Sequence, residues 1–310
     1  MKLLITGGNG LVGKALQEQL KLSDYTIYIP SSKECNLEDF RQTFSYINKR
    51  MPDFTIHLAA NVGGLYKNLN QKVEMFEKNM LINMNILKCS HLCQVKKLVS
   101  CLSTCIFPDD TIYPINESML HNGPPHFSND AYAYAKRMLE IQSKIYNEQY
   151  NTNFICVIPT NIYGPNDNFS LKEGHVIPSL IHQCFLAKKE NKNFVVKGTG
   201  KPLRQFIYSY DVAELILWTL QNYKEKESII LSVSEKNEIS IKNVAIEIAK
   251  NFDYENFIEF DSSHSDGQYK KTADNSKLQS YLPSFKFTPI QSGIENTVKW
   301  SSENYPNLRN

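Results

Sequence analysis

The chain has 310 residues, of which 42% are hydrophobic and 21% are charged, so it can bury a core and is not expected to be disordered. Its 34 Lys and Arg residues nearly balance its 32 Asp and Glu residues, which excludes a nucleic-acid binder driven by bulk positive charge. No apolar run approaches the ~18 residues of a membrane span, and the N-terminal segment lacks a signal-peptide pattern, so we expect no membrane partner and a cytoplasmic location.

In chain order, strand and helix patterns alternate along the first two thirds of the sequence. They predict a strand at 2–6, a helix at 11–22, a strand at 26–30, a helix at 39–50, a strand at 54–60, a helix at 71–93, a strand at 97–102, a helix at 131–150 and a strand at 153–158. Strands separated by helices are typical of βαβ units. We therefore predict an α/β fold with a doubly wound parallel sheet of the Rossmann type.

The pattern changes after about residue 164, where GPNDNF is typical of turns. Beyond it we predict helices at 175–188, 209–222 and 240–251, strands at 194–197 and 229–233, and a frayed tail at 304–310. We expect a nucleotide-binding domain over 1–164, to which about 205–235 returns. A smaller, discontinuous C-terminal substrate-binding lobe is expected over 165–310.

The seven cysteines, an odd number in a long chain, indicate free thiols in a reducing compartment. Cys89, His91 and Cys93 could suggest a zinc site, but they lie on a predicted helix and no second ligand pair of metal spacing follows them. A free cysteine behaves as a small hydrophobic residue. We therefore expect Cys89 and Cys93 to be buried helix residues, and we expect no metal.

A glycine-rich segment, TGGNGLVG at 6–13, follows the first predicted strand directly and opens the first predicted helix. Such glycines permit a tight turn, a close approach to a pyrophosphate and close packing of helix on strand, while the helix N-terminus presents N–H groups to the anion. In this setting the segment predicts a dinucleotide site; the alternative is a glycine-rich turn without a ligand. The predicted contacts are Gly7, Gly8, Asn9, Gly10, Leu11, Val12 and Gly13.

The end of the second predicted strand indicates which dinucleotide binds. An acidic residue there would hold the ribose hydroxyls of NAD. The segment is instead Pro30-Ser31-Ser32-Lys33, and hydroxyls with a cation suit a 2′-phosphate. Ser32 and Lys33 therefore indicate NADPH, the alternative being that Lys33 is a solvated surface residue.

Tyr132 and Lys136 are four residues apart on one face of a predicted helix. We expect the ammonium to lower the pKa of the tyrosine, which eases proton donation to a carbonyl during hydride transfer. Ser103 follows a predicted strand, where open α/β sheets bind ligands, and its hydroxyl can orient the same carbonyl oxygen. A Tyr-x-x-x-Lys spacing alone is common on surface helices, but with the glycine loop and Ser103 it predicts a carbonyl reductase. Tyr134 is the competing tyrosine, without a lysine four residues on.

Together these motifs resemble the extended short-chain dehydrogenase/reductases, and further segments resemble the GDP-L-fucose synthase family within them. The resemblance covers residues 2 to about 289, with its segments in order. It implies NADPH as cofactor, a homodimer formed by helices 71–93 and 131–150, and conversion of GDP-4-keto-6-deoxy-D-mannose to GDP-L-fucose. The matching segments are HLAANVGG at 57–64, STCIFP at 103–108, PTNIYGPNDNF at 159–169, GHVIPSLI at 174–181 and RQFIYSYD at 204–211.

The same resemblance implies that Cys105 and His175 invert C3 and C5 of the sugar before C4 is reduced. A ketone at C4 acidifies the protons on C3 and C5, and inversion needs a base on one side of the ring and an acid on the other. Ordinary pKa values near ~8.5 for Cys and ~6.5 for His allow proton exchange near neutrality. Without the resemblance, Cys105 would be a small buried residue and His175 a helix cap or a surface histidine.

Further site residues follow from the resemblance alone. Near the cofactor it places Lys136, Pro159, Asn161, Ile162 and His175. Near the substrate it places Asn161, Gln183, Lys197, Arg204 and Asp266. A guanidinium suits a diphosphate and a carboxylate suits hydroxyls. The alternatives are a surface ion pair for Arg204 and a turn residue for Asp266.

Two positions depart from the family's pattern, since a tryptophan is usual where Lys197 stands and a basic residue where Gln183 stands. These changes leave open a C4-reductase without epimerase activity, acting on a related GDP-4-keto-6-deoxy sugar such as a heptose. A more remote alternative is a non-catalytic NADP-sensing protein. The presence of Ser103, Tyr132 and Lys136 argues against it, because a sensor needs none of them.

Overall fold

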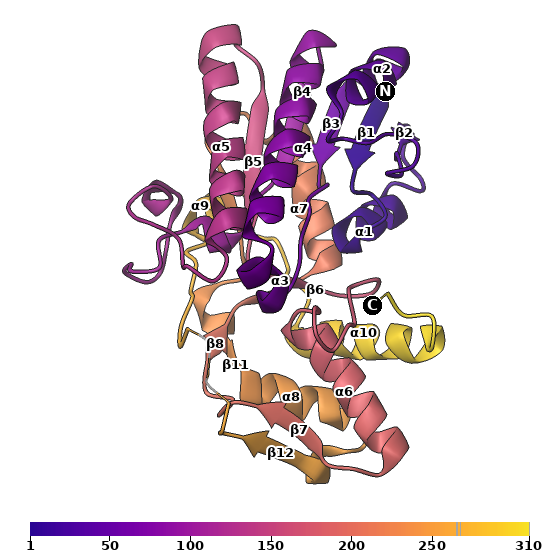
Figure 1. The fold of residues 1–310 in the computed structure, drawn as a ribbon, viewed down its shortest axis with the longest axis vertical. Coiled ribbons are helices and arrows are strands. Elements are labelled where there is room, and N and C mark those ends of the chain that lie inside the picture. Colours follow the sequence, from indigo (N-terminus) through magenta and orange to yellow (C-terminus); the bar gives the residue numbers. More distant parts are fainter. Residues whose placement is uncertain (265, 267, 310) are drawn as a thin grey trace. The chain divides into compact units, whose positions relative to one another are not determined.

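The computed structural model describes residues 1–264, 266 and 268–309, which form two compact units (Figure 1). The first unit comprises Met1–Thr111, Glu117–Pro159 and Val212–Leu231, and the second comprises Ile112–Asn116, Thr160–Asp211 and the chain from Ser232 on. The chain thus enters the second unit at Thr160 rather than after Gly164, and the short segment 112–116 also belongs there. The segment that returns to the first unit is 212–231, within the expected range of 205–235.

The first unit is built on one parallel six-stranded sheet in the order β10-β5-β4-β3-β1-β2. Its strands are β1 (Lys2–Thr6), β2 (Thr26–Tyr28), β3 (Phe54–His57), β4 (Lys97–Cys101), β5 (Phe154–Pro159) and β10 (Ile229–Leu231). The strand order reverses between β1 and β3, and ligands of open α/β sheets bind at such a switch point, beyond the carboxyl ends of the strands. The predicted doubly wound parallel sheet is confirmed.

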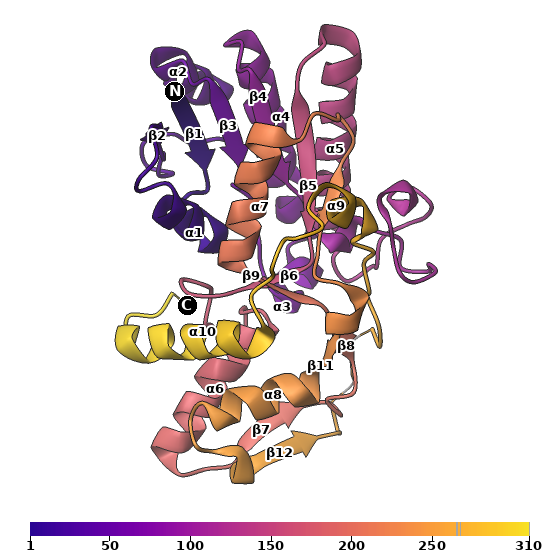
Figure 2. The ribbon, with the colours of Figure 1, turned by 180° about the vertical axis from the view of Figure 1, so that it is seen from behind.

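Helices cover both faces of this sheet. The helices of the unit are α1 (Leu11–Gln19), α2 (Phe40–Arg50), α3 (Leu65–Asn70), α4 (Lys72–Leu92), α5 (Asp130–Tyr150) and most of α7 (Ser209–Asn222). The long helices α4 and α5 pack together on one face (Figure 1), and α7 lies on the other (Figure 2). Two single 3₁₀ turns, η1 (Thr104–Ile106) and η2 (Glu117–Met119), follow β4. The helix α3 was not predicted.

The start of β4 fastens the end of α7. Lys97 is only 6% exposed, and its ammonium donates to the carbonyls of Thr219 and Tyr223, at 2.6 and 2.5 Å. The last carbonyls of a helix have no partner within the helix itself. A buried cation therefore satisfies them and ties a late segment of the chain to an early strand.

The second unit contains three two-stranded sheets and four helices among its described residues. The sheets pair β6 (Asn161–Tyr163) with β9 (Phe206–Tyr208), β7 (Phe194–Lys197) with β12 (Ile258–Asp261), and β8 (Leu203–Arg204) with β11 (Ile239–Ser240). The helices are α6 (Val176–Glu190), α8 (Ile241–Lys250), α9 (Ser276–Tyr281) and α10 (Ile290–Asn304), and two 3₁₀ turns are η3 (Glu235–Asn237) and η4 (Glu255–Phe257). Of these, α6, β7 and α8 were predicted. The strands β6, β8, β9 and β11, which were not predicted, have only two or three residues each and show too little alternation for a prediction.

The segment after α10 packs onto the second unit, so the prediction of a frayed tail is wrong for the described residues up to 309. Leu308 is 9% exposed, and the carbonyl of Arg309 accepts a hydrogen bond from the amide of Phe169 at 2.8 Å. The ring of Phe169 in turn stacks on Trp300 of α10. Among the described residues, no helix combines the length and the apolar character that crossing a bilayer requires.

Candidate active site

In the glycine-rich turn after β1, neighbouring backbone segments lie so close that side chains would not fit. Gly7 has φ +69°, and a Cβ there would lie 2.6 Å from the amide nitrogen of Ala59 beyond β3. A Cβ on Gly13 would lie 2.3 Å from the carbonyl oxygen of Gly8. The amide of Gly10 donates to the carbonyl of Gly7 at 3.0 Å, and α1 begins one residue later without a side-chain cap. The first amides of α1 are thus left for an anion, and this cradle fits the pyrophosphate of a dinucleotide.

The segment after β2 carries an exposed lysine, and the carboxylate of the next residue is hydrogen-bonded to Ser31. Ser32 and Lys33 are exposed. Glu34, which the sequence reasoning passed over, accepts hydrogen bonds from the backbone N–H and the hydroxyl of Ser31, both at 2.8 Å. These bonds lower the pKa of Glu34. The arrangement leaves Lys33 as the uncommitted charge at this strand end, which suits a 2′-phosphate better than a ribose hydroxyl.

Ser103, Tyr132 and Lys136 lie on elements that pack against each other, η1 and α5. Ser103 caps η1, and its hydroxyl accepts the amide of Cys105 at 3.5 Å. Lys136 is 2% exposed, and its ammonium donates to the carbonyl of Cys101 at 2.8 Å. The same ammonium lies 5.8 Å from the centroid of the Tyr132 ring. A phenol, an ammonium and a hydroxyl thus gather at the carboxyl end of β4.

The prediction that Lys136 lowers the pKa of Tyr132 is wrong for the protein alone. Burial raises the pKa of Tyr132 well above its ordinary value, and the neighbouring thiols of Cys105 and Cys101 act in the same direction. The ammonium hydrogen-bonds to a carbonyl and lies over the ring, so it does not offset the burial of the hydroxyl. Burial also lowers the pKa of Lys136, against the opposing effect of the nearby cysteines. Tyr132 is therefore held as the neutral phenol.

The two predicted epimerisation residues belong to different units. Cys105 lies in η1 of the first unit and is 9% exposed, close enough to Tyr132 and Lys136 to act on their charges. His175 is the exposed N-cap residue of α6 in the second unit. Within that unit its charge acts on Asp167, a 4% exposed acid whose pKa burial raises to about 6. The pairing of Cys105 with His175 stays a prediction.

The remaining predicted residues near the cofactor lie at the end of β5 and just after it. Pro159 is the last residue of β5 in the first unit. Asn161 and Ile162 lie in β6 of the second unit, where Asn161 donates through its side chain to the carbonyl of Gln205 at 2.8 Å. Gln205 is fully buried and donates in turn to the carbonyl of Val233 at 2.9 Å. These contacts hold β6 and β9 together with Asn161 at the first position of its strand.

The predicted substrate residues are spread over the second unit. Arg204 donates to the carbonyl of Leu203 at 2.7 Å, and burial lowers its pKa against the effect of Tyr113 and Glu238. Gln183 donates to the hydroxyl of Ser179 within α6, at 3.3 Å.

Lys197 is exposed at the end of β7. Asp266 lies close by, because its carboxylate accepts the amide and hydroxyl of Thr199 at 2.8 and 2.6 Å, and these bonds lower its pKa. Lys197 and Asp266 thus share one end of the β7–β12 sheet.

Sequence reasoning missed a buried polar chain that crosses four elements of the first unit. Thr6 bonds to Nδ1 of His57 at 2.7 Å, Nε2 of His57 bonds to Oδ1 of Asn83 at 3.1 Å, and Nδ2 of Asn83 donates to the carbonyl of Ala135 at 3.3 Å. Because Asn83 presents its oxygen to Nε2, that nitrogen carries the proton and Nδ1 accepts from Thr6. Burial lowers the pKa of His57 to about 3, with a contribution from Lys136. The available signal was a pair of asparagines four residues apart, Asn79 and Asn83, on a predicted helix.

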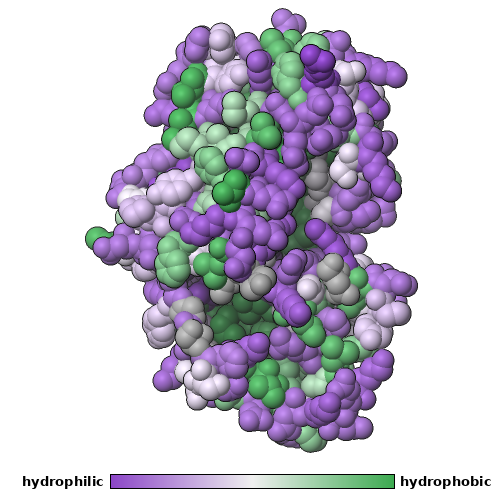
Figure 3. All heavy atoms as spheres, in the orientation of Figure 1, coloured by the Kyte–Doolittle hydropathy of each residue, from purple (hydrophilic) through white to green (hydrophobic). Residues whose placement is uncertain are grey.

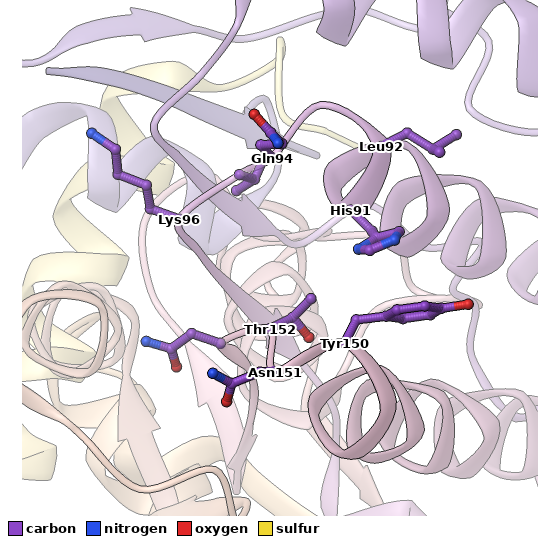
Figure 4. A pocket seen from close by; sticks show the side chains of 9 residues that line it. His91, Leu92, Gln94, Lys96, Tyr150, Asn151 and Thr152 are labelled. Carbon is purple, nitrogen blue, oxygen red and sulfur yellow. The ribbon is translucent and has the colours of Figure 1, made fainter.

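A surface pocket in the first unit lies away from these residues (Figure 4). The ends of α4 and α5 and the turns that enter β4 and β5 line it, and the ring of His91 stacks on Tyr150 with centroids 4.3 Å apart. It lies at the amino ends of the parallel strands, whereas ligands bind at the carboxyl ends. No predicted site residue lines it. Among the described residues, no three His, Cys, Asp or Glu side chains gather in a metal-binding arrangement.

Comparison with known proteins agrees with this geometry. Residues 3–233 match the NAD dependent epimerase/dehydratase family. The chain is 52% identical to a GDP-L-fucose synthase of Dictyostelium discoideum over 311 residues, covering 99% of this chain and 97% of that protein. It superposes with a TM-score of 0.95 and 47% identity on a GDP-L-fucose synthetase from Naegleria fowleri bound to NADP, covering 100% of this chain and 95% of that one. A GDP-D-glycero-L-gluco-heptose synthase of Campylobacter jejuni has a TM-score of 0.88 and 25% identity, covering 96% of this chain and 97% of that one.

Proposed function

This chain belongs to the NAD dependent epimerase/dehydratase family, and we propose that it is an NADPH-dependent epimerase/reductase that converts GDP-4-keto-6-deoxy-D-mannose to GDP-L-fucose. The observation that carries the proposal is the gathering of Ser103, Tyr132 and Lys136 at the carboxyl end of β4, in the unit that also contains the glycine cradle. The 52% identity over the whole length to a GDP-L-fucose synthase supports the substrate. The NADP in the Naegleria structure, together with Lys33, supports the cofactor.

In the proposed reduction at C4, Tyr132, Ser103 and Lys136 have separate roles. NADPH, when bound, supplies the hydride. The glycine turn would hold its pyrophosphate, and Ser32 and Lys33 would bind its 2′-phosphate. Tyr132 donates its proton to the C4 oxygen, and Ser103 donates a hydrogen bond to the same oxygen. The Lys136 ammonium stabilises the phenolate that forms, so the high pKa of Tyr132 in the protein alone suits an acid that is neutral until it reacts.

Epimerisation precedes reduction in this proposal. Cys105 as thiolate takes the proton from C3 and then from C5, and His175 as imidazolium delivers a proton to the opposite side. Tyr132 and Ser103 stabilise the enolate oxygen at C4 during both inversions. Arg204 suits the diphosphate, and Asn161, Gln183, Lys197 and Asp266 are proposed substrate contacts in the second unit.

We further propose a cytoplasmic homodimer. None of the seven cysteines, all of them among the described residues, forms a disulfide, as expected in a reducing compartment. Exposed apolar side chains lie along the paired helices α4 and α5. Figure 3, drawn in the orientation of Figure 1, shows apolar surface over these two helices. A second copy of this helix pair would bury them. Sedimentation velocity should give twice the monomer mass; a monomer at micromolar concentration would contradict this part of the proposal.

The experiment that tests the function is incubation of the protein with GDP-4-keto-6-deoxy-D-mannose in D₂O, with and without NADPH. We expect NADPH consumption, deuterium at both C3 and C5 by NMR, and GDP-L-fucose as product. Cys105→Ser should lose the deuterium label, whereas Cys101→Ser, a thiol four residues earlier, should keep it. Absence of NADPH consumption with this substrate would overturn the proposed function.

A second candidate is a C4-reductase for a related GDP-4-keto-6-deoxy sugar such as a heptose, which Lys197 and Gln183 favour. NADPH consumption without any label at C3 and C5 would establish it in place of the bifunctional enzyme. NADPH binding without turnover of either sugar would instead indicate a non-catalytic NADP-sensing protein.

A further inference from the structure

Arg137 is a buried arginine that follows Lys136 on α5 and has no part in the reduction described above. It is 6% exposed. Its Nε donates to the carbonyl of Ile106 at 2.5 Å, and Ile106 is the last residue of η1, next to Cys105. Arg137 therefore fastens the 3₁₀ turn that carries Cys105 to the helix that carries Tyr132 and Lys136.

One end of the guanidinium remains uncompensated. The Nη2 atom is buried and has no hydrogen-bond partner among the described residues. The ring of Tyr134 lies 5.7 Å from Cζ, and a half-exposed aromatic ring compensates a buried cation only in part. An arginine side chain stays protonated in proteins, so this site holds a permanent positive charge at the cost of burying it.

That charge also acts on Cys105, the residue just before the Ile106 carbonyl that Arg137 binds. Burial lowers the pKa of Arg137, and the two groups that oppose this effect are Tyr134 and Cys105. An electrostatic interaction is reciprocal, so a cation that a thiolate stabilises also stabilises the thiolate. Lysine or arginine beside a cysteine favours its thiolate form, which is the form that acts as a base or nucleophile.

Three groups of α5, Tyr132, Lys136 and Arg137, interact electrostatically with Cys105, and Cys101 lies four residues before it at the end of β4. Tyr132 is held neutral, and Lys136 bonds to the carbonyl of Cys101. Arg137 is thus a cation of this helix that holds the turn by a hydrogen bond and also acts on the Cys105 thiol.

We propose that Arg137 is the positioning residue of the epimerisation step: its Nε anchors the Cys105 turn, and its charge favours the Cys105 thiolate that removes the sugar protons. This inference rests on the proposed function for the step itself. In that step a C–H bond at C3 or C5 breaks, the S–H bond of Cys105 forms, and the electron pair moves onto the C4 oxygen as the enolate. The opposite-face acid then supplies the new C–H bond, and solvent restores both groups.

The test measures Cys105 ionisation directly and needs no sugar. The full-length protein with NADP⁺ is treated with iodoacetamide at a series of pH values, and mass-spectrometric fragmentation separates alkylation of Cys105 from that of Cys101. In Arg137→Gln the midpoint of the Cys105 profile should rise by about one pH unit, which makes alkylation about tenfold slower near neutrality. Arg137→Lys keeps the charge and should stay near the native midpoint. Arg41→Gln, which removes an exposed arginine of α2, should not move it.

An unchanged midpoint in Arg137→Gln would overturn the inference, and so would equal shifts in the Gln and Lys variants. Should Arg137→Gln fail to show a cooperative thermal transition, Arg137→Lys decides alone, because a large shift despite the retained charge would contradict the proposal. With the GDP-sugar in D₂O, Arg137→Gln should incorporate deuterium about tenfold more slowly with NADPH affinity unchanged. A native protein that turns over no GDP-sugar but shows the alkylation shift would refute the proposed function and leave the electrostatic role of Arg137 intact.

Discussion

The hydroxyl of Thr6 lies 2.7 Å from Nδ1 of His57, a contact between the last residues of the two strands that border the switch point of the sheet. Thr6 immediately precedes the glycine turn, and the same imidazole reaches Asn83 and, through it, the backbone of the helix that carries Tyr132. One buried chain of hydrogen bonds therefore links the start of the glycine turn to the helix that carries Tyr132. The direction of its hydrogen bonds requires a neutral histidine, because Nδ1 accepts from Thr6 while Nε2 donates to Asn83.

Replacing that histidine should weaken the protein in a pH-dependent way. His57→Leu leaves Thr6 and Asn83 unpaired in the core, at a cost of about 2–5 kcal/mol in the free energy of unfolding near pH 7. The pKa of His57 falls from 6.5 unfolded to about 3 folded, so the native protein binds fewer protons when folded and loses stability as pH falls from 6.5 toward 3. The difference in the free energy of unfolding between the native protein and the variant should therefore narrow by about 1.4 kcal/mol per pH unit over that range. Urea unfolding at pH 7, 6 and 5 checks this, and a constant gap would contradict it.

A single methyl group in the glycine turn should abolish tight cofactor binding. Gly7→Ala forces a Cβ to within 2.6 Å of Ala59 in a backbone with φ +69°, so the turn must open. We expect at least tenfold weaker NADPH binding, measured by the cofactor's fluorescence. Gly123→Ala is the matched control, because its Cβ would meet only Pro108, at 3.4 Å. Equal affinity of both variants would refute the assigned cradle.

The phenol of Tyr132 should be required for reduction but not for holding the cofactor. Tyr132→Phe removes the proton donor, and we expect kcat to fall about 10²- to 10⁴-fold while NADPH affinity stays the same. Tyr134→Phe, two residues away on the exposed side of α5, should retain activity. If Tyr132→Phe keeps native turnover of the 4-keto sugar, the phenol is not the acid.

The buried carboxylate of Asp167 should lower the free energy of unfolding at neutral pH, where it is ionised. Burial raises its pKa from 3.8 to about 6, so the folded state holds the proton more tightly, and the native protein gains stability as pH falls from 6 to 3.8. Asp167→Asn removes the buried charge and should be more stable by up to about 3 kcal/mol at pH 7.5, an advantage that vanishes below pH 4. Thermal unfolding at several pH values measures it, with the exposed Asp110→Asn as control. An advantage independent of pH would contradict the assignment.

Local patterns were enough to predict the glycine turn, the long helices and the strands of the main sheet. TGGNGLVG lies within eight consecutive residues, and helices such as 131–150 contain several turns of periodic pattern. The short strands β6, β8, β9 and β11 arise because distant segments meet in the second unit, and no local signal marks them. The tail was missed for the same reason, since its burial depends on Phe169 and α10.

The chemistry of the site was predicted less well than its residues. Spacing indicated that Tyr132 and Lys136 share a helix face, but the pKa of Tyr132 depends on burial among Cys101 and Cys105, which spacing does not show. The Thr6–His57–Asn83 chain needs β1, β3 and α4 to meet. Arg137 is one cation among many in the sequence, and its burial and its hydrogen bond to Ile106 emerge only from the fold.

The return of 212–231 to the first unit has a consequence for synthesis. During translation, β5 leaves the ribosome with all six of its residues destined for burial, yet the strand that pairs with its free edge, β10, comes 70 residues after its end. Until Leu231 emerges, the nascent chain carries an apolar strand with an open edge, and Lys97 lacks the α7 carbonyls that will receive its charge. An expressed fragment ending near residue 164 would keep the glycine turn and the Tyr132 helix but would never gain β10 and α7. We therefore expect it to aggregate rather than serve as an independent NADPH-binding module.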